Sequence, residues 1–121
     1  MKYLSKENRP WGVFYVIEDN RNYKIKRIEV ELGNRLSYQY HKFRSEVWVI
    51  ISGTGKVIIE DEEKSFKKGD IIKISKGSKH RIINDGKEKV VFIEVQTGTY
   101  FGEDDIVRIS DDYNRIKWKK N

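Results

Sequence analysis

Short apolar runs separated by glycine, asparagine and aspartate turns recur along the chain, and they constrain its fold more than any other feature. The runs are rich in valine, isoleucine and aromatic residues, and they cover residues 13–17, 23–32, 46–51, 56–59, 70–74, 81–84 and 90–96. Such runs at short spacing indicate strands. No segment combines a sustained 3.6-residue periodicity with helix-capping residues. The sequence therefore predicts an all-β sandwich, jelly roll or barrel.

The length and composition are those of one globular domain beneath a heavily charged surface. Of the 121 residues, 37% are hydrophobic and 36% are charged. We expect a single domain over residues 1–121, with a core at about residues 11–98 and a C-terminal arm over residues 99–121. The polar stretch over residues 98–110 is expected to wrap the barrel. The absence of cysteine excludes thiol nucleophiles, disulfides and cysteine-ligated metal clusters.

The location expected from the sequence is the cytoplasm. The chain has no apolar stretch of about 18 residues, the minimum for a membrane span. Its first residues, MKYLSKENRPWG, lack the apolar core of a secretory signal. We therefore expect no membrane partner.

The net charge of +6 raises the question of nucleic-acid binding. The basic residues are spread along the chain, and many lie near glycine turns, as at Lys67–Lys68 and Lys87–Lys89. A DNA-binding protein more often concentrates them on one helix or stripe, and no known nucleic-acid motif is present. We expect no nucleic-acid partner. The positive field instead favours a small anionic ligand, such as a phosphorylated metabolite.

Histidine occurs only twice, and one of the two, His41, has other candidate metal-binding side chains near it in the sequence. Gln39 and His41 are two residues apart, so in a regular strand over residues 36–43 both side chains leave the same face. Glu46 follows shortly afterwards, and His80 comes from a later strand. Two imidazoles, a carboxylate and an amide oxygen suit a divalent metal with open positions for substrate. Ordinary core or surface histidines are the alternative.

The glycine spacing around these residues resembles the two motifs of the cupin superfamily. Gly33, Gln39, His41, Glu46 and Gly53 follow the spacing of the first motif, with glutamine at a position where histidine is commoner. The second motif is matched by Gly69, Ser75, Gly77, His80 and Asn84, with serine in place of its usual proline. The resemblance implies a cupin double-stranded β-helix, which is a jelly-roll barrel.

A closer resemblance, to the type II mannose-6-phosphate isomerase domain, extends over nearly the whole chain. It is carried by the segments RPWG (9–12), LSYQYH (36–41), RSEVW (44–48), ISGTG (51–55), HRIIN (80–84), IEVQTG (93–98), YFGEDDI (100–106) and DYNR (112–115). In many bacteria this domain follows a mannose-1-phosphate guanylyltransferase in one bifunctional chain. Because no nucleotide-binding glycine loop precedes the cupin motifs here, we expect a stand-alone cupin.

The resemblance implies a metal-dependent aldose–ketose isomerase that interconverts mannose 6-phosphate and fructose 6-phosphate. The implied metal ligands are Gln39, His41, Glu46 and His80. Arg44 is the implied catalytic residue, and Lys42, Arg81 and Glu94 are expected to contact the substrate. Zinc is the expected ion, with manganese, cobalt, nickel or iron as alternatives. Single-domain cupins frequently pair, so we expect a homodimer.

The chain departs from the family pattern near the metal motif. The family usually has three consecutive histidines where this chain has His41, Lys42 and Phe43, and a further histidine at the position of Val47. These departures predict fewer titratable groups near the metal and leave the general base unassigned. Two alternatives therefore stay open: a non-catalytic or sensory cupin that binds a sugar or sugar phosphate, and a cupin that acts on another small metabolite.

The role of four large aromatic side chains is also open. Trp11, Trp48 and Tyr100 are suited either to stacking on a sugar ring or to packing in the core or an interface. Trp118, in the basic tail, is a candidate dimer contact.

Overall fold

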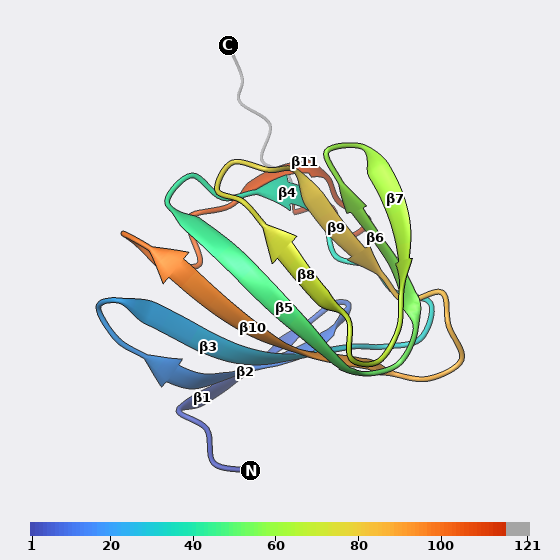
Figure 1. Ribbon diagram of the computed structural model, residues 1–121, viewed down its shortest axis with the longest axis horizontal. Coiled ribbons are helices and arrows are strands. Elements are labelled where there is room, and N and C mark those ends of the chain that lie inside the picture. The colour runs from blue at the N-terminus through green and yellow to red at the C-terminus, as the bar shows by residue number, and fades with distance from the viewer. Residues whose placement is uncertain (116–121) are drawn as a thin grey trace.

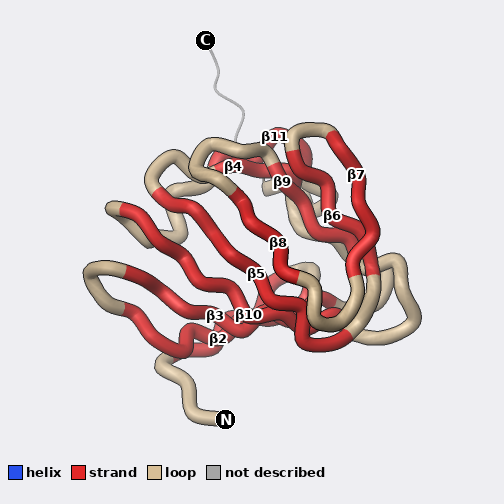
Figure 2. Tube along the Cα trace, in the orientation of Figure 1, coloured by secondary structure: helices blue, strands red, loops and turns tan. Residues whose placement is uncertain are grey.

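The computed structural model describes residues 1–115, and within them the chain forms strands, turns and loops but no helix. Two antiparallel sheets face each other around one core (Figure 1). Strands make up most of the described chain, and turns and loops connect them (Figure 2). Trp118 and the tail lysines Lys117, Lys119 and Lys120 lie outside the described residues. No helix of residues 1–115 is long and apolar enough to cross a membrane.

The larger sheet has six strands in the order β1-β2-β3-β10-β5-β8. Its strands are β1 (Ser5–Arg9), β2 (Gly12–Asp19), β3 (Tyr23–Val30), β10 (Val90–Gly98), β5 (Arg44–Ser52) and β8 (Ile71–Ile74). The smaller sheet has five strands in the order β11-β4-β9-β6-β7. Its strands are β11 (Val107–Ser110), β4 (Tyr38–Tyr40), β9 (His80–Ile83), β6 (Gly55–Ile59) and β7 (Glu62–Phe66). From β4 onward the chain passes repeatedly between the two sheets, which is the arrangement of a jelly roll.

All seven apolar runs of the sequence form strands, which confirms the all-β prediction. Three strands that the sequence did not indicate complete the sheets: β1, β7 and β11. The expected strand over residues 36–43 is much shorter, because only Tyr38–Tyr40 pairs as a strand. The glycines that begin the two motifs have positive φ angles, 73° at Gly33 and 90° at Gly69, where glycine is favoured because it lacks Cβ.

The inner faces of three central strands change from polar to apolar along their length, and this change positions the functional site. On β5 the buried residues run from Arg44 and Glu46 to Trp48 and Ile50. On β10 the same change runs from Gln96 and Glu94 to Phe92 and Val90. On β3 it runs from Lys24 and Lys26 to Ile28 and Val30. The register pairs Gln96 with Glu46 and Phe92 with Ile50, so the polar ends lie together. One end of the barrel is therefore an apolar core, and the other is a buried polar chamber.

Candidate metal centre and substrate cavity

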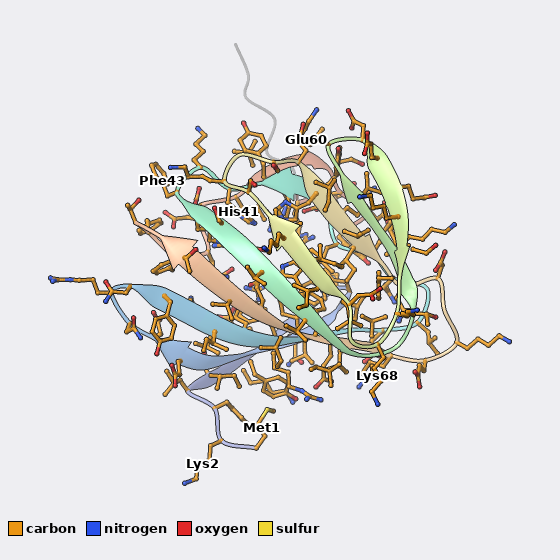
Figure 3. All side chains as sticks on the ribbon, in the orientation of Figure 1. Met1, Lys2, His41, Phe43, Glu60 and Lys68 are labelled. Carbon is orange, nitrogen blue, oxygen red and sulfur yellow. The ribbon has the colours of Figure 1, made fainter. Side chains whose placement is uncertain are left out.

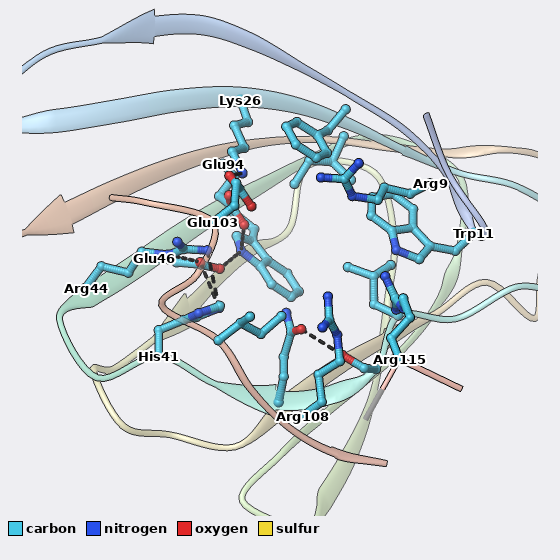
Figure 4. Close-up of a pocket in the computed structure, with 17 residues that line it drawn as sticks. Arg9, Trp11, Lys26, His41, Arg44, Glu46, Glu94, Glu103, Arg108 and Arg115 are labelled. Carbon is cyan, nitrogen blue, oxygen red and sulfur yellow. Dashed lines mark hydrogen bonds and ion pairs between the residues drawn. The ribbon is translucent and has the colours of Figure 1, made fainter. Parts of the chain in front are cut away.

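The polar chamber contains a cavity of about 590 Å³, its open mouth included. Side chains from both sheets and from the C-terminal arm line it (Figure 4): Arg9, Trp11, Phe14, Lys26, Ile28, Leu36, Ser37, Gln39, His41, Arg44, Glu46, Trp48, Glu94, Glu103, Ile106, Arg108 and Arg115. Trp11 and Trp48 also belong to the core cluster, whereas Tyr100 is 45% exposed and does not line the cavity.

His41, Glu46 and His80 form a buried group of metal-binding side chains beside this cavity. One ligand atom from each residue lies within 4.8 Å of the others. The Nε2 atom of His41 is 3.3 Å from Glu46 Oε2, and the Nε2 atom of His80 is 3.9 Å from Glu46 Oε1. Each of the three side chains is at most 3% exposed. The group therefore brings two nitrogen donors and a carboxylate to one point.

The second nitrogen of each histidine contacts a backbone carbonyl, which orients the ring. The Nδ1 atom of His41 is 2.6 Å from the carbonyl oxygen of Asp105, and that of His80 is 2.9 Å from the carbonyl oxygen of Ser78. A proton on Nδ1 can then be donated to the carbonyl, which leaves the Nε2 lone pair directed at Glu46. Metal-bound histidines in proteins are usually held in this way.

Both histidines are held in the neutral form that a metal ligand needs. Burial lowers the pKa of His41 to about 4, with a further contribution from the nearby charge of Arg44. Burial likewise lowers the pKa of His80. Both rings are therefore neutral near pH 7, as metal coordination requires. The buried Nε2 atom of His80 has no hydrogen-bond partner within residues 1–115. These residues fit a divalent metal ion.

Gln39, the fourth expected ligand, lines the same cavity. It pairs with His80 across β4 and β9, and its Oε1 accepts a hydrogen bond of 2.7 Å from Ser37 Oγ. The side chain is thus adjacent to the His41–Glu46–His80 group and held by a neighbouring hydroxyl. Its role as a metal ligand stays a prediction.

Two further charged residues of the cavity contact the metal group or its neighbours. The guanidinium of Arg44 donates from Nε to Glu46 Oε2 at 2.9 Å, and its buried Nη1 has no partner within residues 1–115. The indole of Trp48 donates from Nε1 to Glu46 Oε1 at 3.0 Å and to Glu94 Oε1 at 3.1 Å. Burial, together with the Glu46 carboxylate, raises the pKa of Glu94 to about 7. Arg44 and Glu94 therefore both lie in the wall of the cavity, and their catalytic and substrate-binding roles stay predictions.

The structure does not bring Lys42 and Arg81 into the cavity. Lys42 is exposed in the turn before β5. Arg81 follows His80 on β9, so its side chain leaves the opposite face of the strand, where Nε donates to the Leu36 carbonyl and Nη2 to the Ser110 carbonyl. The positions of both residues do not support their expected contact with substrate.

The departures from the family pattern also lie outside the cavity lining. Phe43 is 49% exposed, and Figure 3 shows it at the periphery while His41 lies between the sheets. Val47 alternates with Glu46 and Trp48 on β5, so its side chain leaves the other face of the strand. Strand alternation and the turn therefore direct the side chains at these two positions away from the cavity.

Several cavity residues were not identified as functional from the sequence. They come from β1, β3 and the C-terminal arm: Arg9, Lys26, Glu103, Arg108 and Arg115. Arg9, Glu103 and Arg115 belong to segments that carried the family resemblance, but no role followed from those segments alone. Arg108 had no signal of its own, because the pairing of β11 with β4 is a long-range contact.

Two antiparallel sheets around a buried His–Glu–His group define a cupin with a candidate metal centre. Solved structures support this fold. An uncharacterized protein with a double-stranded β-helix domain from Klebsiella pneumoniae matches with a TM-score of 0.70 and 20% identity over 78% of this chain and 80% of its own. An oxalate decarboxylase variant from Bacillus subtilis matches with a TM-score of 0.75 and 19% identity, over 87% of this chain and 30% of its own.

The family follows from the sequence comparison. The model of the family described as "Mannose-6-phosphate isomerase C-terminal" matches residues 1–111, and the chain belongs to that family. A mannose-1-phosphate guanylyltransferase from Salmonella montevideo is 44% identical over 107 residues, which are 88% of this chain and 23% of that protein. The chain thus spans about a quarter of the length of this curated relative.

Proposed function

We propose that the chain is a metal-dependent aldose–ketose isomerase that interconverts mannose 6-phosphate and fructose 6-phosphate. The observation that carries the proposal is the buried His41–Glu46–His80 group at the edge of a cavity that also contains the Glu94 carboxyl group. Membership of the mannose-6-phosphate isomerase C-terminal family supports the choice of substrate. The predicted homodimer, the cytoplasmic location and the single domain over residues 1–121 remain predictions.

Glu46 and the two histidines would hold the ion, with Gln39 as a further candidate ligand. A divalent metal bound there would act as a Lewis acid that polarises the substrate oxygens on C1 and C2. The cysteine-free donor set of nitrogen and oxygen atoms is compatible with zinc and equally with manganese, cobalt, nickel or iron. Zinc is the proposed ion, and metal analysis would identify it.

Arg44 and Glu94 are the residues proposed to act on the substrate. The unpartnered Nη1 donor of Arg44 is placed to bind a substrate oxygen on which negative charge develops. Glu94 lies in the cavity wall with its Oε1 atom held by the Trp48 indole. Its carboxylate would take the proton from one carbon and return it to the neighbouring carbon, so the group ends each cycle unchanged.

The test is a coupled assay of fructose 6-phosphate conversion on metal-stripped protein, with divalent metals added one at a time. We expect about one ion per chain and turnover that depends on the metal. Turnover should be lost in His41→Ala and in Arg44→Lys. Arg21→Gln, which removes an exposed positive charge in the β2–β3 turn, is the control and should retain turnover. A protein that binds no divalent metal and turns over no substrate would overturn the proposal.

A non-catalytic cupin that binds a sugar phosphate is the second candidate. It is favoured by the fact that both histidines of the chain belong to the metal group, with each Nδ1 atom directed at a backbone carbonyl. No histidine is therefore free for proton transfer. Tight binding of mannose 6-phosphate without turnover under any metal would favour this candidate.

A further inference from the structure

Arg108 is an unpaired charge in the wall of the cavity. It lies on β11 opposite Gln39 of β4, and its side chain lines the same chamber. Within residues 1–115 its guanidinium has no carboxylate within ion-pair distance, and its buried Nε has no hydrogen-bond partner. A guanidinium group that is partly withdrawn from water without an acceptor is unfavourable, because its N–H groups lose hydration and gain nothing in return.

The other cationic side chains that line the cavity differ from Arg108 in this respect. Each has a carboxylate partner: Arg9 with Glu7, Lys26 with Glu103, Arg44 with Glu46 and Arg115 with Asp111. The Arg115 pair is bidentate, with both hydrogen bonds at 2.9 Å. Arg108 is therefore the cavity cation whose charge residues 1–115 leave unmatched.

The surroundings of Arg108 disfavour its positive charge unless an anion is bound beside it. Burial and the positive charge of Arg115 lower the pKa of the Arg108 guanidinium more than the carboxylate of Asp111 raises it, and arginine remains charged near pH 7. Figure 4 shows Arg9, Arg108 and Arg115 on the side of the cavity away from His41 and Glu46. The unmatched charge of Arg108 thus lies across the chamber from the candidate metal centre, beside the carboxylate-paired guanidinium groups of Arg9 and Arg115.

This arrangement matches the shape of a hexose phosphate. The phosphoryl group on C6 is at the other end of the carbon chain from C1 and C2, where the isomerisation occurs. The planar fork of an arginine donates paired hydrogen bonds to phosphate oxygens, and a phosphoryl dianion supplies the negative charge that Arg108 lacks. A neutral sugar would leave this charge unmatched.

We propose that Arg108, flanked by Arg9 and Arg115, is the binding subsite for the phosphoryl group of the substrate. This inference rests on the proposed function for the identity of the sugar, but phosphoryl recognition itself does not require turnover. It replaces the expectation that Lys42 and Arg81 contact the substrate.

The test measures equilibrium binding to the full chain by calorimetry, with inorganic phosphate, mannose 6-phosphate and mannose as probes. In the wild type we expect mannose 6-phosphate to bind at least about tenfold more tightly than mannose. Arg108→Gln should weaken mannose 6-phosphate and inorganic phosphate binding by about tenfold or more. It should leave the affinities for mannose and for the divalent metal unchanged. Arg108→Lys should restore only part of the lost affinity, because an ammonium group lacks the bidentate fork.

Arg21→Gln is the matched control, since it removes the same charge from an exposed turn outside this cavity. Equal weakening in Arg21→Gln and Arg108→Gln would indicate only the long-range field and would overturn the subsite. Unchanged phosphate binding in Arg108→Gln would also overturn it. If Arg108→Gln does not fold, the wild-type preference for mannose 6-phosphate over mannose and the intermediate affinity of Arg108→Lys decide the matter. Failure of the isomerase proposal would appear separately, as loss of turnover with phosphate discrimination intact.

Discussion

The backbone carbonyl oxygen of Asp105 lies 2.6 Å from Nδ1 of His41, although the two residues are 64 positions apart in the sequence. The carboxylate of the same aspartate accepts hydrogen bonds from the backbone N–H groups of Lys42 and Phe43, at 2.9 and 3.0 Å. One buried residue of the C-terminal arm therefore orients a candidate metal ligand and fixes the turn that follows it.

Asp105→Ala should weaken divalent-metal binding by about tenfold to a hundredfold, the usual effect of losing an orienting partner of a metal ligand. The substitution keeps the backbone carbonyl but releases the turn at Lys42 and Phe43, so the His41 ring loses its fixed direction. Competition with a chelator measures the affinity. Asp104→Ala, which removes the adjacent and exposed carboxylate, is the control and should bind metal as the wild type does. Equal metal affinity in Asp105→Ala would contradict this account.

The sequence predicted most of the large sheet and the centre of the site because both depend on local pattern. Because side chains alternate along β5, Arg44 lies on the same face as Glu46. The spacing of the cupin motifs brought His41, Glu46 and His80 together, and the structure confirms that their ligand atoms converge.

What the sequence could not predict depends on contacts between distant segments. The strand β7 has the sequence EEKSF, in which only Phe66 is buried, so no alternating apolar pattern marks it. The strand β1, SKENR, has no apolar residue, and β11, VRIS, is only four residues long. They pair with β2 and β4, and in this way they bring Arg9 and Arg108 to the cavity.

Arg81→Ala is expected to destabilise the fold. The guanidinium donates to the Leu36 carbonyl at 2.7 Å and to the Ser110 carbonyl at 3.0 Å, so it ties β11 to the start of β4. Loss of these charged hydrogen bonds should lower the free energy of unfolding by about 1–3 kcal/mol in urea denaturation. Lys42→Ala, at an exposed position, should change it by no more than about 0.5 kcal/mol. A higher KM in Arg81→Ala with unchanged stability would instead restore its role as a substrate contact.

Glu94→Gln should abolish turnover while metal and mannose 6-phosphate binding persist. The amide is close to the carboxyl group in size and can still accept the Trp48 hydrogen bond, but it cannot take a proton from carbon. We expect kcat to fall by about a hundredfold or more, the contribution usual for general acid–base catalysis. The measurement is the coupled assay together with calorimetric binding. Retention of full turnover in Glu94→Gln would exclude Glu94 as the base.

The stability of the metal-free protein should depend on opposing titrations of the two buried histidines and of Glu94. The pKa of His41 is lowered from 6.5 to about 4 in the folded protein. Between these pH values the unfolded chain therefore binds a proton at His41 more readily than the folded protein does. Stability from His41 is therefore lost as the pH falls from 6.5 toward 4. The pKa of Glu94 is raised from 4.5 to about 7, so the folded protein holds a proton that the unfolded chain releases. Stability from Glu94 is lost as the pH rises from 4.5 to 7.

Two variants separate these contributions. Glu94→Gln should make stability rise more steeply with pH than in the wild type, and His41→Asn should make it rise less steeply or fall. Each group contributes at most about 1.4 kcal/mol per pH unit, the limit for one proton. Urea unfolding of chelator-treated protein at several pH values between about 4 and about 7 measures the slope of the free energy of unfolding against pH. If the slope of Glu94→Gln equals that of the wild type, Glu94 does not hold a proton in the folded chamber near neutral pH.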